Sequence, residues 1–101
     1  MTPVKARDLI VKCFYEAQRE TFAAAGENLG RAPNDAELHN TVTGAVRVTF
    51  REAGADFDHP TKDSLMAVVQ ILARKSKSWG TPPDIVEHHQ NQIGSVLQAL
   101  G

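Results

Sequence analysis

Cysteine is nearly absent from the sequence, which has one, Cys13, among its 101 residues. A single thiol cannot form a disulfide within the chain, whereas small extracellular domains commonly depend on several. Cys13 falls near the apolar face of a predicted helix, where a lone thiol usually behaves as a small hydrophobic side chain. We therefore expect a cytoplasmic protein that is stabilised by its hydrophobic core and has no covalent cross-links.

Long apolar segments are also missing. A membrane-spanning helix needs about 20 predominantly apolar residues, and no apolar run in the sequence is that long. The first run, residues 9–11, is too short for a signal peptide and is bounded by charged residues. The sequence therefore predicts no membrane partner.

Neither sign of charge dominates, because 11 Lys and Arg residues are balanced by 12 Asp and Glu residues and the net charge is -1. A chain without a strong positive field is not expected to bind nucleic acid by default. One local group, Arg74, Lys75 and Lys77 beside Trp79, combines basic and aromatic residues as nucleic-acid sites do. A helix C-terminus also favours these charges, and we expect Trp79 to pack in the core. We therefore expect no nucleic-acid partner.

The sequence does contain a repeated segment. Residues 29–46 align with residues 79–96 without a gap, and Gly, Pro, Glu, His, Gly and Val recur in place. Average residue usage predicts about one identity in such a window. Connections between helices share Gly, Pro and capping residues, but this does not explain the second Gly, the His and the Val. We therefore predict two related helical hairpins, about 3–54 and 61–101.

Apolar residues recur at helical spacing in four segments, about residues 3–25, 35–53, 62–79 and 82–100. Each segment follows a residue that can cap a helix: Thr2, Asn34, Thr61 and Thr81. Three segments precede a glycine that can stop a helix: Gly26, Gly54 and Gly80. Residues 42–50 are rich in β-branched side chains, so a strand is the competing prediction there. The caps and the matching second copy favour a helix.

Four helices joined by short connections fold most simply as an up-down-up-down bundle. We therefore predict an all-α single domain over residues 1–101, with the second and fourth helices diagonally opposite. Gly44 and Gly94 lie inside these two helices, where glycine costs about 1 kcal/mol relative to alanine. Their recurrence predicts that a neighbouring helix approaches closely at both positions.

His39 and His89 are the candidate ligand or metal residues. Each lies on the predicted apolar stripe of its helix, the bundle would bring both to one end of the core, and Glu20 could reach the same layer. Neutral imidazole is the commonest protein ligand for metals. However, the Glu-x-x-His motif of di-iron bundles is absent. We expect buried, hydrogen-bonded histidines and no metal cofactor.

Apolar residues exceed what a four-helix core needs. The first helix has a second apolar stripe, away from Cys13 and Ala17, and the third is apolar on nearly every side between residues 65 and 73. A helix that is apolar all round is either central or part of an interface, and a four-helix bundle has no central helix. The predicted interface residues are Val11, Tyr15, Phe22, Leu65, Met66 and Ile71.

These features favour a non-enzymatic helical module that forms at least a homodimer or docks a partner protein. The alternative is a small-ligand or metal-binding bundle centred on His39 and His89. The two hypotheses predict different metal contents and different masses in solution. No residue is assigned a catalytic role.

Overall fold

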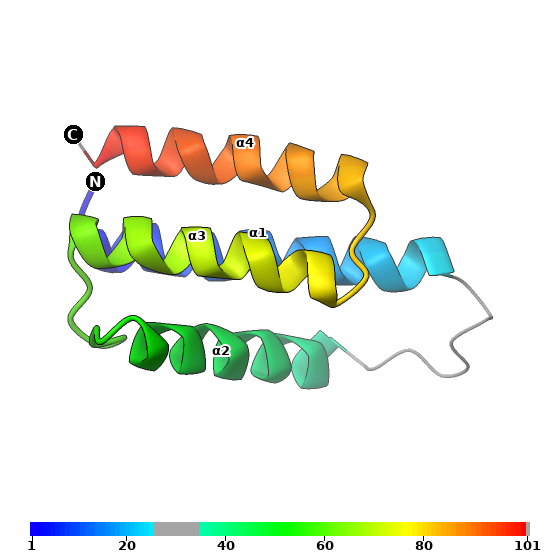
Figure 1. Cartoon of the computed structure of the whole chain (residues 1–101), viewed down its shortest axis with the longest axis horizontal. Helices are drawn as coiled ribbons and strands as arrows, with labels where there is room; N and C mark the ends of the chain where they lie inside the picture. Colours follow the sequence, from blue (N-terminus) through cyan, green and yellow to red (C-terminus); the bar gives the residue numbers. More distant parts are fainter. Residues whose placement is uncertain (26–34, 101) are drawn as a thin grey trace.

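The structure, a computed structural model, describes residues 1–25 and 35–100. It has four helices, listed in chain order: α1 (Pro3–Ala25), α2 (Asp35–Glu52), α3 (Lys62–Ser78) and α4 (Pro83–Ala99). Successive helices run in opposite directions, so that both chain termini lie at one end of the molecule (Figure 1). The predicted all-α four-helix bundle is confirmed. Because α2 includes residues 42–50, the competing strand is excluded.

The helices form an elongated bundle of 41 × 23 × 21 Å. α1 packs against α2 and α4, and α3 packs against the same two helices from the other side. α1 also contacts α3 across the diagonal, whereas α2 and α4 do not touch. No helix among the described residues has both the length and the apolar character needed to cross a membrane.

The core consists of apolar side chains that recur every three or four residues along each helix. Its fully or almost fully buried members include Ile10, Phe14, Val42, Val46, Phe50, Leu65, Val68, Leu72 and Ile93. Each such side chain contributes about 1.5–3 kcal/mol relative to an exposed position. The stripe predicted for the third helix is confirmed at its four buried positions: Leu65, Val68, Leu72 and Ser76.

Several helix ends follow the capping signals of the sequence. The Thr2 hydroxyl accepts a hydrogen bond from the Lys5 amide at 3.2 Å. Thr61 and Ser64 form a reciprocal capping box at the start of α3. Gly54 and Gly80, with φ of 70° and 80°, end α2 and α3 in the left-handed conformation that glycine adopts without strain.

Two other capping predictions have different outcomes. Pro82 occupies the N-cap of α4 without a side-chain hydrogen bond, so the prediction that Thr81 caps this helix is wrong. Thr81 is buried, and its hydroxyl accepts a hydrogen bond from Gln18 instead. The predicted cap Asn34 lies outside the described residues.

The predicted close approach of a helix at Gly44 and Gly94 is wrong. A Cβ atom added at either glycine would meet no atom within 4 Å. The described structure therefore has open space at both positions. Packing between these helices does not explain why glycine recurs there.

The relation between the two hairpins is not confirmed. Positions 50 residues apart differ in burial, since His39 is exposed while His89 is buried, and Val42 is buried while Gln92 is exposed. A shift of 51 residues, which pairs Val42 with Ile93, brings buried positions together instead. The two inward stripes are thus displaced by one residue relative to the sequence alignment.

The connection between α2 and α3 is anchored by Phe57. Its ring packs edge-on against Phe50 at 5.4 Å, and the guanidinium carbons of Arg7 and Arg47 lie 4.6 and 4.1 Å from its centre. Arg7 Nη1 also donates to the Phe57 carbonyl at 2.8 Å. His59, in the same connection, is exposed and lies 2.9 Å from Asp56. The half-buried Phe57 thereby ties this connection to α1.

Candidate functional site

His39 does not lie in the core. Its side chain is exposed on α2, and the buried residue is its neighbour Leu38. The ring of Tyr15 lies 5.7 Å from that of His39. A hydrogen bond to Asp35 raises the pKa of the Tyr15 hydroxyl, because the carboxylate favours the protonated phenol. The predicted inward position of His39 is therefore wrong.

His89 is buried as predicted, at 3% exposure. Its Nε2 atom lies 3.1 Å from Glu20 Oε2, and its Nδ1 atom lies 3.0 Å from Gln92 Oε1. The predicted approach of Glu20 to His89 is confirmed, over a separation of 69 residues. Both ring nitrogens have partners, as a buried imidazole requires.

His39 and His89 do not form a joint site. They lie on α2 and α4, which make no contact. In the part of the chain that the structure describes, no group of three or more His, Cys, Asp or Glu side chains is arranged to hold a metal ion. The metal or ligand site predicted between His39, His89 and Glu20 thus reduces to the His89–Glu20 pair.

The residues of the predicted interface are divided between core and surface. Val11 and Leu65 belong to the core, while Tyr15 and Phe22 are half-buried against it. Of the six predicted interface residues, Ile71 is half-buried and only Met66, at 44% exposure, is an exposed side chain. The prediction that Val11 faces outward is wrong. Because α1 contacts all three other helices, more of its surface is buried than a single apolar stripe.

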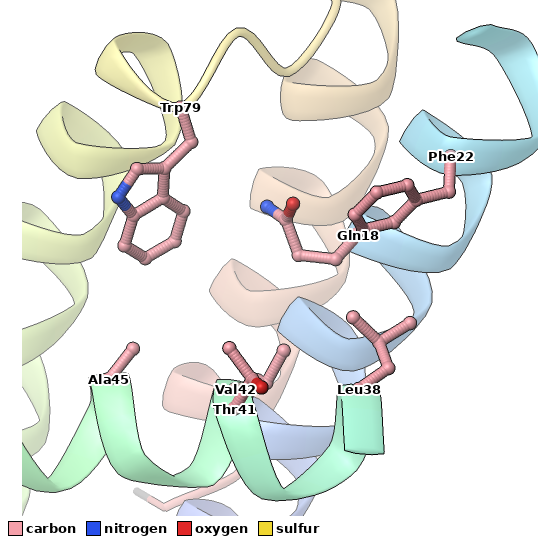
Figure 2. A pocket seen from close by; sticks show the side chains of 7 residues that line it. All are labelled: Gln18, Phe22, Leu38, Thr41, Val42, Ala45 and Trp79. Carbon is pink, nitrogen blue, oxygen red and sulfur yellow. The ribbon is translucent and has the colours of Figure 1, made fainter. Parts of the chain in front are cut away.

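An apolar groove of about 460 Å³ lies between α1, α2 and the residue that follows α3. We call it the α1–α2 groove. Seven residues line it: Gln18, Phe22, Leu38, Thr41, Val42, Ala45 and Trp79. The α2 residues form its floor, Gln18 and Phe22 of α1 form one wall, and Trp79 forms the opposite wall (Figure 2). Its volume lies within the range of about 300–1,000 Å³ that is typical of ligand sites.

The lining of the α1–α2 groove carries no charge. Five of its seven residues are apolar or aromatic, and the other two are Gln18 and Thr41. The Gln18 amide nitrogen donates to Thr81 Oγ1 at 3.2 Å, and the Thr41 hydroxyl donates to the Glu37 carbonyl at 2.9 Å. A second groove, of about 520 Å³, includes Lys77 and Glu87 in a more polar lining. The α1–α2 groove is therefore the better site for an apolar group.

The α1 wall of this groove is fixed by two long-range contacts. Gln18 is hydrogen-bonded to Thr81, and Glu20 is paired with His89. Both contacts join the C-terminal half of α1 to α4 or to the connection that precedes it. A binding surface on anchored helices loses less conformational freedom when it is occupied.

Trp79 was expected in the core but is 41% exposed. It follows α3 directly and precedes Gly80, whose positive φ turns the chain toward α4. Lys75, one turn earlier, does not add to a basic surface, because its ammonium donates to Thr49 and pairs with Glu52 at 3.1 Å. The aromatic side chain thus contributes to the α1–α2 groove, a role that its sequence neighbours did not indicate.

Cys13 has the properties of a structural thiol. It is half-buried, and burial together with the nearby Glu16 carboxylate raises the pKa of its thiol. A raised pKa lowers the thiolate fraction at neutral pH, and the thiolate is the nucleophile. The sequence-based interpretation of Cys13 as a small hydrophobic side chain fits this environment.

No protein-family model, no curated protein and no solved structure matches the chain.

Proposed function

We propose that the protein is a non-enzymatic interaction module that binds an amphipathic helix of a partner protein in the α1–α2 groove. The observation that carries this proposal is the exposed Trp79 beside an uncharged, apolar groove. Helix-in-groove recognition uses such surfaces to take apolar side chains at helical spacing. Tryptophan is also among the residues that contribute most to binding at protein interfaces.

The dimensions of the groove support a helical occupant. The α2 residues of its floor, Leu38, Thr41, Val42 and Ala45, span two turns of helix, which corresponds to about 10 Å along the axis. A partner helix crossing this floor would place two or three successive side chains between Phe22 and Trp79. The lack of charge in the lining favours an apolar face on the partner, because burying an unpaired charge is costly.

A partner protein is preferred here over a second copy of the chain. Val11 and Leu65 are buried in the core, so the outward apolar surface is smaller than the sequence predicted. Sedimentation equilibrium tests this preference, and a mass of 11.0 kDa per particle is expected at micromolar concentration. A dimer that dissociates when Trp79 is changed to alanine would make the second copy the occupant.

A displayed library of helical peptides, randomised along one face, tests the proposed function. Selection on the native protein should enrich peptides with apolar residues at spacings of three and four. The same peptides should bind the Ala45→Glu variant at least tenfold more weakly, because this change puts a carboxylate into the floor of the groove. Circular dichroism and thermal unfolding would show that the variant is folded.

Ala67→Glu is the matched control, because Ala67 is an exposed alanine on α3 that does not line the groove. Its affinity for the selected peptides should equal that of the native protein. Peptides that bind Ala45→Glu normally and lose affinity for Ala67→Glu would contradict the proposal and would point to the outer face of α3.

A further inference from the structure

A second groove, of about 520 Å³, lies between the end of α3 and the first half of α4. We call it the α3–α4 groove, and its lining consists of Lys77, Thr81, Pro83, Val86, Glu87, Gln90 and Asn91. Both grooves lie toward the end of the bundle that is opposite to the chain termini, because α3 ends and α2 and α4 begin there (Figure 1). A partner that docks in one groove is therefore close to the other.

The two grooves are separated by the last turn of α3. Lys77 and Trp79 point about 200° apart around the helix axis, so that Trp79 lines the α1–α2 groove while Lys77 lines the α3–α4 groove. The ridge between them is low at Gly80, which is exposed and where, apart from the adjacent residues, no atom lies within 4 Å of the position of an added Cβ. A helix is about 10–12 Å across, so about four extended residues of a partner cover the distance.

The α3–α4 groove differs from the α1–α2 groove in its charge. The Lys77 ammonium and the Glu87 carboxylate both line it, and neither forms a hydrogen bond or an ion pair with another residue that the structure describes. Gln90 and Asn91 are exposed and add side-chain amides, each of which can donate and accept. The backbone groups of an extended peptide need such partners. The groove therefore suits an extended polar segment that carries one acidic and one basic residue.

The α1–α2 groove by itself offers a small contact area. Its floor spans two turns of α2 and takes two or three side chains of a partner helix, and even an aromatic side chain buries only about 150–250 Å². Stable protein interfaces bury about 800 Å² on each partner. A partner that binds stably needs further contact beside this groove, and the α3–α4 groove offers it.

Resting on the proposed function, we infer that the partner has two parts: an apolar helix in the α1–α2 groove and a short polar segment that crosses Gly80 into the α3–α4 groove. An acidic residue of this segment pairs with Lys77, and a basic residue pairs with Glu87. The apolar helix supplies most of the affinity. The polar segment selects among partners, because charge complementarity contributes more to specificity than to affinity.

A second displayed library tests this inference. It keeps the tightest helix whose binding is lost in Ala45→Glu and adds about eight randomised residues at either end, twice the length needed to cross the ridge. Selection on the native protein should enrich extensions that carry one acidic and one basic residue. The extended peptide should bind Lys77→Glu and Glu87→Lys about threefold to tenfold more weakly, because each reversal replaces an attraction by a repulsion.

The helix without its extension should bind the native protein and both reversal variants with equal affinity. Lys62→Glu is the matched control, because Lys62 is exposed at the start of α3 and lines neither groove. It makes the same change of net charge as Lys77→Glu and should leave the affinity for the extended peptide unchanged. The double variant with Lys77→Glu and Glu87→Lys should prefer a peptide in which the acidic and basic residues of the extension are exchanged.

The possible results separate this inference from the proposed function. Extensions that add no affinity, or that add the same affinity on the reversal variants, would overturn the inference while docking in the α1–α2 groove stands. A helix that binds the reversal variants more weakly even without its extension would also overturn it, because the two charges would then act on the first groove. If no selected helix depends on Ala45, the proposed function fails and the inference falls with it.

Discussion

Replacing Gly44 and Gly94 by alanine should stabilise the protein. Both glycines lie inside helices, α2 and α4, where glycine costs about 0.5–1 kcal/mol relative to alanine. Apart from the adjacent residues and the backbone of the same helix, no atom lies within 4 Å of the position that a new Cβ would take, so no steric term opposes this gain. Each substitution should therefore raise the free energy of unfolding by about 0.5–1 kcal/mol and the Tm by about 2–8 °C.

The two effects should add, because α2 and α4 do not touch and distant substitutions are usually independent. The double variant is then about 1–2 kcal/mol more stable than the native protein, as measured by urea unfolding at 25 °C. Gly54→Ala is the matched control, since its φ of 70° strains any residue with a Cβ, and it should lower stability.

A loss of stability in Gly44→Ala or Gly94→Ala would refute this reasoning. It would show that the space beside these glycines is occupied in solution, for example by another copy of the chain. In that case the loss should depend on protein concentration, whereas an intramolecular clash should not.

Three further predictions concern Glu20, Arg7 and the thiol of Cys13. Glu20→Ala should lower the free energy of unfolding by about 1–3 kcal/mol, because it leaves Nε2 of the buried His89 without its partner. Urea unfolding measures this change, and a loss below about 0.5 kcal/mol would contradict the prediction. Arg7→Ala should lower the free energy of unfolding by about 1.5–3 kcal/mol, because the hydrogen bond to the Phe57 carbonyl and the contact with the Phe57 ring are lost. Asp8 is exposed, so the control Asp8→Ala should change the free energy of unfolding by less than about 1 kcal/mol. Cys13 should react with a disulfide reagent more slowly at pH 7.5 than a cysteine in an unstructured peptide, because its raised pKa reduces the thiolate fraction; an equal or faster rate would show that the thiol is activated.

The helices were predictable because their signals are local. Thr61, Gly54 and Gly80 mark helix ends through their own capping or backbone preferences. The stripe through Leu65 and Leu72 likewise follows from spacing alone. Such features do not depend on how one helix is placed against another.

The two histidines differ in how well local sequence signals predict their positions. His89 was correctly placed, and Glu20 reaches it as expected. The inward position predicted for His39 is wrong. Adjacent positions on a helix differ by about 100°, and the apolar residues of α2 fit an inward stripe through either Leu38 or His39. Contact with α1 and α3 decides this rotation, and that contact is a property of the assembled bundle.

The α1–α2 groove could not be predicted from the sequence for a similar reason. Its lining comes from α1, α2 and the residue that follows α3, which are far apart in the sequence and meet only in the assembled bundle. Trp79 did not signal the groove, because a tryptophan at the end of an apolar helix is expected to pack in the core, whereas it is 41% exposed. The sequence pattern gave no indication that Gln18 and Phe22 would lie opposite it.

The α1–α2 groove is the proposed docking surface of the protein. The most direct test is the ¹⁵N–¹H spectrum of the native protein with the tightest helix selected from the displayed library. Chemical shift changes should concentrate at Gln18, Phe22, residues 38–45 and the Trp79 indole. Changes confined to the outer face of α3 around Met66 and Ile71, with an unperturbed Trp79 indole, would contradict the claim.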